Sequence, residues 1–572
     1  MPAKKARLYL LIALPWLVLL VSLGSGAAAL AAPVVAPDAG QSLQQMQNAQ
    51  PPSTGPAKPA PLAAPEGEKA NNAGQSTAGA HIHLSHLVFT GNTVFSSAVL
   101  NQVTGNLHDQ EVTLADLQTA ADEVTHYYRA HGYLVARAYL PQQKVNNSEV
   151  TIAVLEGTLS DIQAHNTSHV SQRLVNGILS HGLHTGKPLR SGPANRALML
   201  LREMPGVASI QGSLHPGSSV GSTALNVAVT PASRVKGQVG LDNYGNRYTG
   251  RYRLTGSLYL PNLLGIGDQL SLQGAISERN ELDYGRLSWD APVGYNGLRL
   301  GVALSNTRYT LGDAFSNLDA HGTARTAALY GSYPLILAPT HSLKLGVSLE
   351  HRQLTDITGI VNADMRKRAN VAVLTLGGDI HDSLLGGGAT AWRLANTVGN
   401  LTLNAQAAQQ DQLAKTAGNY DKLVLSASRL QALPFRFSLY LAGTVQWASK
   451  NLDSSEKFFL GGGNGVRAYP QGEAPGDEGW LVNLALLYQI ESGLQVKVFQ
   501  DEGGVTINRN PYLIGQGNHR HLSGTGLGLE VDTLAHHVTM GMDVAWRNGT
   551  GIPTSDTHSN NPLIWVHGAY HF

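Results

Sequence analysis

The sequence predicts a mainly β protein, in which a transmembrane β-barrel of about 16 strands follows two small α/β modules. Two sequence patterns support this: an export signal opens the chain, and residues 232–572 alternate apolar and polar side chains. The composition agrees with it. With 63 glycines, 42% hydrophobic and 14% charged residues, the chain is too polar for a helical membrane protein and too sparsely charged for an ordinary cytosolic enzyme.

Residues 1–31 have the pattern of a secretory signal peptide. A cationic start precedes the apolar run 8–23, and the small-x-small pattern at 29–31 predicts cleavage near Ala31. The alternative is an uncleaved membrane anchor, which an apolar run of this length also permits. Beyond this segment no stretch of about 18 uninterrupted apolar residues recurs, so any later membrane span must consist of strands. Export together with spanning strands indicates a bacterial outer membrane.

Residues 32–80 are predicted to be a linker. The segment is rich in Pro, Ala, Gln, Asn and Gly, and such a composition cannot bury enough apolar surface to offset the entropy of ordering. One short helical pattern interrupts it at 38–49, where Asp38 is a candidate N-cap and Leu43 and Met46 are apolar. A helix of this length is marginal in water on its own.

Residues 81–231 are predicted to form two α/β modules, 81–157 and 158–231. In the first, a strand ends at the Gly91-Asn92 turn, and 114–131 has apolar residues at helical spacing before Gly132. Strands are expected at 133–140 and 149–155, then helices at 170–183 and 191–204, then strands at 209–214 and 223–229.

His81 and His83 share one face of the first predicted strand and could in principle hold a metal ion. A metal site needs about three or four ligands, and the sequence places no others beside them. Solvated histidines at the sheet edge are therefore the favoured interpretation, and no metal site is expected.

The barrel prediction depends on the alternation within 232–572. In 251–260 most even positions are apolar and most odd positions are polar, so the two faces of the strand meet different solvents. A soluble sandwich shows the same pattern. Many segments of about ten residues after an export signal favour instead a closed membrane barrel, although the length also allows about 18 strands. The same period recurs at 298–306, 342–350, 438–447, 482–490 and 538–546.

Two barrel segments suggest a site in the lumen. Residues 457–480 are glycine-rich and precede a strand, so they are predicted to form a long loop. On the strand at 494–501, one face carries Gln495, Lys497, Phe499 and Asp501, and the other carries Leu494, Val496 and Val498. A charged side chain that faces lipid costs about 2 kcal/mol or more near the midplane, so Asp501 is predicted to face the lumen.

Several functions are excluded or disfavoured. A net charge of +1 gives no electrostatic grip on nucleic acid, and the absence of cysteine excludes disulfides and thiolate metal sites. No GxxxxGK[ST] loop is present, and no GxSxG motif stands in a strand-to-helix context. The sequence therefore predicts neither an enzyme nor a cofactor site.

Ordered motifs in the first module resemble a known family. The runs HLVFTGNTVF at 86–95, YYRAHGYLVARAYLPQQ at 127–143 and EVTIAVLEG at 149–157 are similar to the first periplasmic POTRA domain of the two-partner secretion transporters. These are also called TpsB, or the haemolysin secretion/activation family. The second module occupies the place of their second POTRA domain, and 239–270 resembles their opening barrel hairpin.

The resemblance extends to residues that carry the family's function. The loop 457–480 resembles an extracellular loop of the family that folds back into the barrel. In the family, the tip of that loop carries a Val-Arg-Gly-Tyr tetrad. Here the tetrad is Val466, Arg467, Ala468 and Tyr469, with alanine in place of glycine. Phe499, Asp501 and Gly503 match the family's Phe-x-Asp-x-Gly motif.

The end of the chain resembles the signal that the barrel assembly machinery reads. Ile564, Val566, Tyr570 and Phe572 lie in the outward phase of the last strand, which suits contact with outer-membrane lipid. Tyr570 and Phe572 are the candidate insertion signal.

The resemblance implies a transporter in the bacterial outer membrane, with its POTRA domains in the periplasm. It would act as a monomer and export a large TpsA-type partner protein, adhesin-like or haemolysin-like. The partner would bind the POTRA domains and pass unfolded, without nucleotide hydrolysis. A loop held by Arg467 and Asp501 would gate passage, and 38–49 would be a plug helix.

The sequence also permits other interpretations. The Arg467–Asp501 pair could merely brace the barrel. In a wet lumen such a pair contributes only about 0–1 kcal/mol, and more if the loop excludes water. The protein could also be an assembly insertase of the same superfamily, or a diffusion porin.

Overall fold

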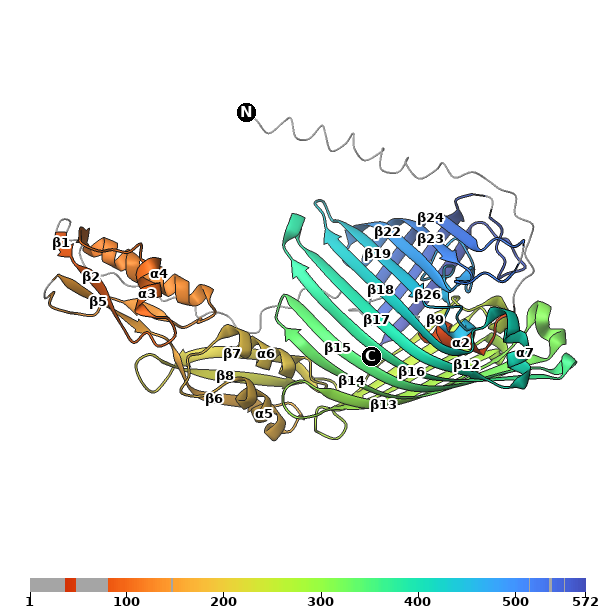
Figure 1. Cartoon of the computed structure of the whole chain (residues 1–572), viewed down its shortest axis with the longest axis horizontal. Helices are drawn as coiled ribbons and strands as arrows, with labels where there is room; N and C mark the ends of the chain where they lie inside the picture. Colours follow the sequence, from red (N-terminus) through yellow and green to blue (C-terminus); the bar gives the residue numbers. More distant parts are fainter. Residues whose placement is uncertain (1–35, 48–80, 146–147, 514, 534–536, 550) are drawn as a thin grey trace, which may run out of the picture.

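The computed structural model describes residues 36–47, 81–145, 148–513, 515–533, 537–549 and 551–572. Two small α/β domains lie in a row beside one end of a large closed barrel (Figure 1). The predicted fold class is therefore confirmed. Among the described residues, no helix is long and apolar enough to cross a membrane. The predicted signal peptide and most of the predicted linker lie outside the described residues.

The first domain places two helices against a small mixed sheet. Strand β5 runs parallel to β2 and antiparallel to β4, and β1 pairs with β3. The single first strand that the sequence indicates is divided at Ser85, and helix α3 has no counterpart in the predicted elements. The elements are β1 (His81–Leu84), β2 (His86–Thr90), α3 (Ser97–Val103), β3 (Gln110–Thr113), α4 (Leu114–Ala130), β4 (Arg137–Tyr139) and β5 (Glu149–Leu155).

Helix α4 organises the core of this domain. Its first turn is closed by a capping box, in which the Thr113 and Asp116 side chains each accept from the other residue's backbone N–H. Farther along, the Tyr128 hydroxyl donates to the Glu156 carboxylate at 2.9 Å. Burial and this carboxylate raise the pKa of Tyr128, so its hydroxyl remains a donor. Glu156 also accepts from the backbone N–H groups of Thr93 and Val94, which fixes the turn after β2.

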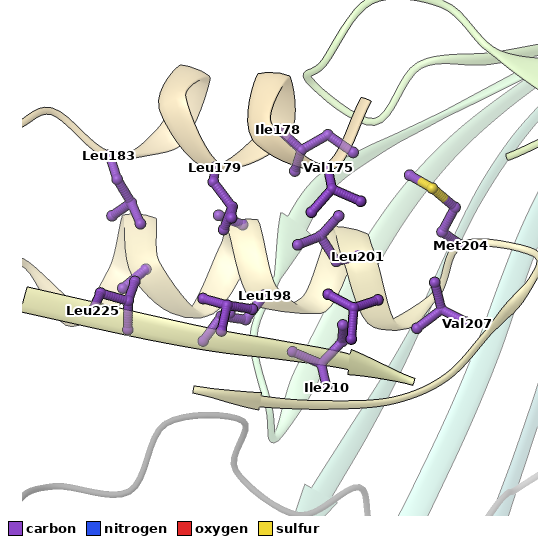
Figure 2. Packing of buried hydrophobic residues seen from close by; sticks show 14 of the residues in the cluster. Val175, Ile178, Leu179, Leu183, Leu198, Leu201, Met204, Val207, Ile210 and Leu225 are labelled. Atoms are coloured by element: carbon purple, nitrogen blue, oxygen red, sulfur yellow. The ribbon is translucent and has the colours of Figure 1, made fainter. Parts of the chain in front are cut away.

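The second domain repeats this plan with two adjacent helices over a three-stranded sheet in the order β6-β8-β7. Figure 2 shows Leu179 of α5, Leu198 of α6 and Leu225 of β8 meeting in its core, where all three are buried. Strand β6 was not anticipated from the sequence. The elements are β6 (Thr158–Asn166), α5 (Gln172–Gly182), α6 (Ser191–Arg202), β7 (Val207–Pro216) and β8 (Ser222–Pro231).

The barrel contains sixteen of the described strands, each antiparallel to its neighbours, and β26 pairs with β9 to close it. Closure leaves no strand edge exposed to lipid. The first eight strands are β9 (Lys236–Asp242), β10 (Arg253–Pro261), β11 (Gln269–Ser277), β12 (Leu282–Pro292), β13 (Arg299–Thr310), β14 (Ala320–Leu337), β15 (His341–Thr358) and β16 (Ala363–Asp382). The others are β17 (Gly388–Leu403), β18 (Gly418–Ala432), β19 (Phe437–Ala448), β22 (Glu478–Glu491), β23 (Leu494–Thr506), β24 (His519–Thr533), β25 (Val538–Arg547) and β26 (Leu563–His571).

Connections differ between the two ends of the barrel. At one end every connection has at most seven residues, whereas at the other end several are longer, including the one that contains α7 (Ala405–Ala414). The 3-10 turns are η1 (Arg247–Thr249), η2 (Glu278–Asn280), η3 (Asp313–Leu318), η4 (Gly359–Val361) and η6 (Ser454–Glu456), and η5 (Leu384–Gly386) lies in a short turn.

The second α/β domain docks on the short-turn end. Arg196 of α6 donates to the Pro334 carbonyl at 2.7 Å, and Lys344 of β15 pairs with Glu203 at 2.8 Å. The backbone N–H of Ser171 also donates to the carbonyl of Gly265 at 2.8 Å. The long loops therefore open on the side away from the α/β domains.

Candidate functional site in the barrel lumen

The connection between β19 and β22 folds into the barrel and forms the site. Inside it, β20 (Phe458–Phe459) pairs with β21 (Pro475–Gly476), which ties the two arms of the loop together. At the tip, the Val466 N–H donates to the Leu460 carbonyl at 2.7 Å, and a Cβ at Gly465 would lie 2.0 Å from that oxygen. The tip is thus a compact turn that glycine permits.

The tetrad residues other than Arg467 are almost fully buried. Val466, Ala468 and Tyr469 are each at most 2% exposed. Ala468 does not adopt the left-handed backbone conformation that would require the family's usual glycine. Its methyl group faces Gly524 of β24, where an added Cβ would lie only 2.4 Å away. The alanine is therefore compatible with the turn, and a glycine on the wall makes room for it.

Arg467 and Asp501 lie in direct contact. Arg467 donates from Nη2 to Asp501 Oδ1 at 2.7 Å and from Nε to Oδ2 at 2.8 Å, a bidentate pair of planar groups. Its backbone N–H donates to the same carboxylate at 3.1 Å. The guanidinium also covers the ring of Phe499, with Cζ 3.4 Å from the ring centroid.

Three wall residues complete the pocket around Arg467. Asp543 of β25 accepts from Nη1 at 3.0 Å, so the guanidinium is held between two carboxylates. Asn483 of β22 donates to Asp501 at 2.8 Å, and Trp565 of β26 donates from its indole N–H to the Arg467 carbonyl at 2.6 Å.

These contacts were not predicted, although Asp543 carries a signal. It is the one carboxylate in the strand Val538–Arg547, and parity places it on the inner face. Asn483 and Trp565 have no comparable signal, because polar and aromatic residues are common along the barrel strands.

Burial decides how strong the contact is. Arg467 is 9% exposed and Asp501 is fully buried, so the loop excludes water from the pair. Removing one partner of such a pair typically destabilises a protein by about 3–5 kcal/mol, because the other charge stays buried and unpaired. The Arg467–Asp501 contact is therefore a buried ion pair. It is not a solvent-exposed pair, which would contribute little to stability.

Gly503, the last residue of the Phe-x-Asp-x-Gly motif, has a steric role. A Cβ at this position would lie 2.6 Å from the Leu460 side chain of the loop and 2.7 Å from the backbone carbonyl of Trp480. Glycine therefore allows the loop to approach β23 closely.

A second set of contacts holds the arm of the loop beyond the tip. The buried carboxylate of Glu473 pairs with Arg520 of β24 at 2.5 Å. It also accepts from the backbone N–H groups of Thr554 and Ser555, in the connection between β25 and β26. The loop is thus anchored at its tip and along its returning arm.

Helix α2 (Ala39–Gln47) also lies inside the barrel (Figure 1). Asp38 caps it, accepting from the Gln41 N–H at 2.9 Å. Leu43 is fully buried among Tyr248, Tyr309 and other apolar side chains. Ala39 donates from its N–H to Asp356 of β15 at 2.8 Å.

The other predicted residues lie elsewhere. Tyr570 and Phe572 are about half exposed, at 51% and 47%, on the outer face of the barrel end. His83 contacts Asp109 at 3.1 Å, and the described residues hold no group of three or more side chains suited to a metal.

Comparisons with known proteins agree on the kind of protein. Residues 221–531 match the family described as haemolysin secretion/activation protein ShlB/FhaC/HecB, and residues 82–157 match the POTRA domain of ShlB type. The chain is 31% identical over 473 residues to the heme/hemopexin transporter protein HuxB of Haemophilus influenzae, covering 80% of this chain and 82% of HuxB.

Two further matches involve CdiB. Identity to the outer membrane transporter CdiB of Escherichia coli O6:K15:H31 (strain 536) is 24% over 427 residues, covering 73% of this chain and 70% of CdiB. A solved structure of CdiB from Escherichia coli matches with a TM-score of 0.71 at 19% identity, covering 96% of this chain and all of that chain. The structural match supports the fold.

The fold defines an outer-membrane β-barrel with periplasmic POTRA domains. The chain belongs to the haemolysin secretion/activation family, the TpsB transporters of two-partner secretion. The predicted location is confirmed: the barrel lies in the outer membrane and the POTRA domains lie in the periplasm. The family is one of transporters and not of enzymes.

Proposed function

We propose that this protein exports a large partner protein, unfolded, from the periplasm to the cell surface through the barrel lumen. The loop that carries Arg467 acts as the gate. The observation that carries the proposal is the burial of Arg467 between Asp501 and Asp543, because it holds the loop across the lumen by contacts to the wall.

A gate of this kind has to be firm at rest and able to open. The tip is held by charged groups, which water or a polar cargo backbone can solvate once the loop moves. The lumen is obstructed at rest by the loop and by α2, which we infer to be a plug. An obstructed lumen favours a gated transporter over a diffusion porin.

Export needs a source of free energy. The sequence lacks a phosphate-binding loop, and no nucleotide is available in the periplasm. We infer that the cargo folds outside the cell, where a stability of about 5–15 kcal/mol makes backward unfolding rare.

The POTRA domains would capture the cargo. Strand β4 in the first domain and β7 in the second lie at the edges of their sheets. An extended amphipathic segment can add to such an edge as a further strand. Titrating the full-length transporter with the N-terminal domain of its cargo tests this step, and absence of binding would discard it.

The relatives suggest which cargo to try first. HuxB is named as a heme/hemopexin transporter, which makes a hemopexin-binding exoprotein the first candidate.

The gating proposal is tested with Arg467→Ala in a secretion assay. We expect a folded barrel in the membrane, shown by heat-modified gel mobility, with export reduced by more than about tenfold. Arg366→Ala is the matched control, because Arg366 lies exposed on β16 and pairs only with its neighbour Asp364 among the described ion pairs. Export at the wild-type level by Arg467→Ala would contradict the proposal that this loop is the gate.

A further inference from the structure

The outer wall of β12 to β15 changes character partway along its length. Toward the POTRA end its outward side chains are apolar and exposed, and toward the cell-surface end they are polar or basic. The apolar group comprises Leu287, Leu304, Leu329 and Leu349, and the polar group comprises Asn306, Arg308, Arg325, His351 and Gln353. The register pairs neighbours of the same kind, such as Leu287 with Leu304 and Asn306 with Arg325.

This change marks the edge of the hydrocarbon layer. Strand β15 has 18 residues, whereas a spanning strand needs about 9–11. Its outward apolar run ends at Leu349, and the next three outward residues, His351, Gln353 and Thr355, are polar. The remainder of β15 therefore projects past the membrane on the side of the long loops, away from the POTRA domains.

A hollow of about 730 Å³ lies on the outer wall at this edge. Three leucines line its apolar part, and Arg325, His351 and Gln353 line its polar part. The hollow exists because two residues of its floor, Gly285 and Ala327, have small side chains or none. A Cβ added at Gly285 would meet nothing within 4 Å. The three leucines are Leu272, Leu287 and Leu304.

Among the described residues Arg325 takes part in no ion pair, whereas Arg299 and Arg352 of the same wall each contact a carboxylate. Arg308 stands directly opposite Asp283 in the register of β12 and β13, so its charge has a neighbouring countercharge. In the part of the chain that the structure describes, His351 hydrogen-bonds to neutral groups, Asn370 at 2.8 Å and Gln353 at 3.1 Å. The polar side of the hollow therefore presents a cation without a countercharge.

We propose that this hollow binds the phosphorylated lipid of the outer leaflet, with an acyl chain against the leucines and a phosphate at Arg325. Apolar surface below a cation, at the depth of the headgroups, matches the two parts of such a lipid. In the outer leaflet of a bacterial outer membrane that lipid is lipopolysaccharide, whose lipid A carries phosphates next to its acyl chains. This site is separate from the proposed transport path, which lies inside the barrel.

The test uses the full-length protein in detergent and native mass spectrometry with bis-phosphorylated lipid A. We expect one lipid A per chain at saturation, and binding about tenfold weaker for Arg325→Gln, the effect of losing one charge-assisted contact. Gly285→Phe fills the hollow without removing a charge and should also weaken binding. Arg366→Gln is the control, since Arg366 is an outer-wall arginine already paired with Asp364 at 2.6 Å, and it should bind normally.

Lipid A without phosphates and phosphatidylglycerol complete the experiment. Weak binding of both supports a site for the phosphorylated lipid of the outer leaflet. Equal binding of lipid A with and without phosphates, or equal binding of phosphatidylglycerol, would overturn the proposal. Unchanged affinity in both Arg325→Gln and Gly285→Phe, with normal heat-modified mobility, would overturn it as well.

Discussion

The two objects inside the barrel, the loop tip and helix α2, are held in different ways. The tip has one arginine between two wall carboxylates, and its loop is part of the barrel chain at both ends. Helix α2 has nine residues, no basic residue of its own, and an apolar contact centred on Leu43. A buried ion pair holds the loop tip, whereas apolar packing of Leu43 and polar contacts at the N-terminus hold helix α2.

This difference suggests an order of movement. A nine-residue helix has little stability of its own once it leaves its contacts. The loop, in contrast, must separate a buried ion pair. We therefore expect α2 to leave the lumen at lower cost than the loop.

One lysine connects the two objects. Lys367 of β16 lies 3.5 Å from Asp38, which caps α2, and 2.7 Å from Asp453, at the base of the loop. Asp38 also accepts from the Ser454 hydroxyl at 2.6 Å. Departure of α2 would therefore remove contacts from the base of the loop.

Among the variants considered, Asp501→Asn should reduce export most. Asp501 accepts three hydrogen bonds from Arg467, whereas Asp543 accepts one. We expect export to fall by more than about tenfold in Asp501→Asn, because a neutral amide leaves Arg467 poorly paired. Asp543→Asn should reduce export less. A secretion assay beside proteolysis of the loop measures both, and equal effects would contradict the assigned roles.

A charge reversal separates gating from bracing. Exchanging the charges of Arg467 and Asp501 places the new carboxylate at 467 beside Asp543. The two carboxylates repel each other, so this double variant should be unstable. Adding Asp543→Asn removes the repulsion and should restore heat-modified mobility. The gate predicts that export stays low in this triple variant, because the arginine is missing from the tip. Recovery of export together with stability would mean that the pair only braces the barrel.

A smaller effect is expected from Gly40→Val, which acts on α2 alone. A Cβ at Gly40 would lie 2.3 Å from the Ser454 hydroxyl oxygen and 2.5 Å from the Ser455 backbone nitrogen. The helix should leave the lumen, and the conductance of the barrel in planar bilayers should rise. Gln47→Val, at the exposed end of α2, is the control and should change little. Wild-type conductance for Gly40→Val would show that α2 does not obstruct the lumen.

The smallest effect is expected from Asp38→Ala. Loss of an N-cap typically costs about 1 kcal/mol, so α2 should stay in place most of the time. We expect brief openings in single-channel recordings, less frequent than those of Gly40→Val. If Asp38→Ala opened more often than Gly40→Val, the contacts of Asp38, including Lys367, would hold the helix more strongly than its close packing at Gly40.

Much of the fold could be predicted from the sequence because its two-residue alternation and helical apolar spacing correspond to strands and helices of the structure. The alternation at 251–260 and 538–546 corresponds to β10 and β25, and the apolar spacing at 114–131 corresponds to α4. Helix α3 was missed because its seven residues bury one large apolar side chain, Leu100, and show no amphipathic period.

The candidate site was only partly predictable. Parity and motif together pointed to Arg467 and Asp501, which are 34 residues apart and in contact. The position of Lys367 beside the carboxylates of Asp38, Asp356 and Asp453 could not be foreseen. It stands between two arginines, and only the folded loop and α2 bring Asp453 and Asp38 to it.

The most direct test of the account is to lock the loop inside the barrel. The chain contains no cysteine, so an introduced pair is free of background. Gly463 of the loop faces Tyr244, with an added Cβ 3.1 Å from a ring carbon, and Tyr244 packs edge-on against Trp565 of the wall. Secretion is measured for Gly463→Cys with Tyr244→Cys, oxidised and then reduced, beside each single variant.

We expect little or no export while the disulfide is closed and recovery after reduction, with both single variants exporting throughout. Export at the wild-type rate with the disulfide closed would contradict the claim that this loop has to move for the partner protein to pass.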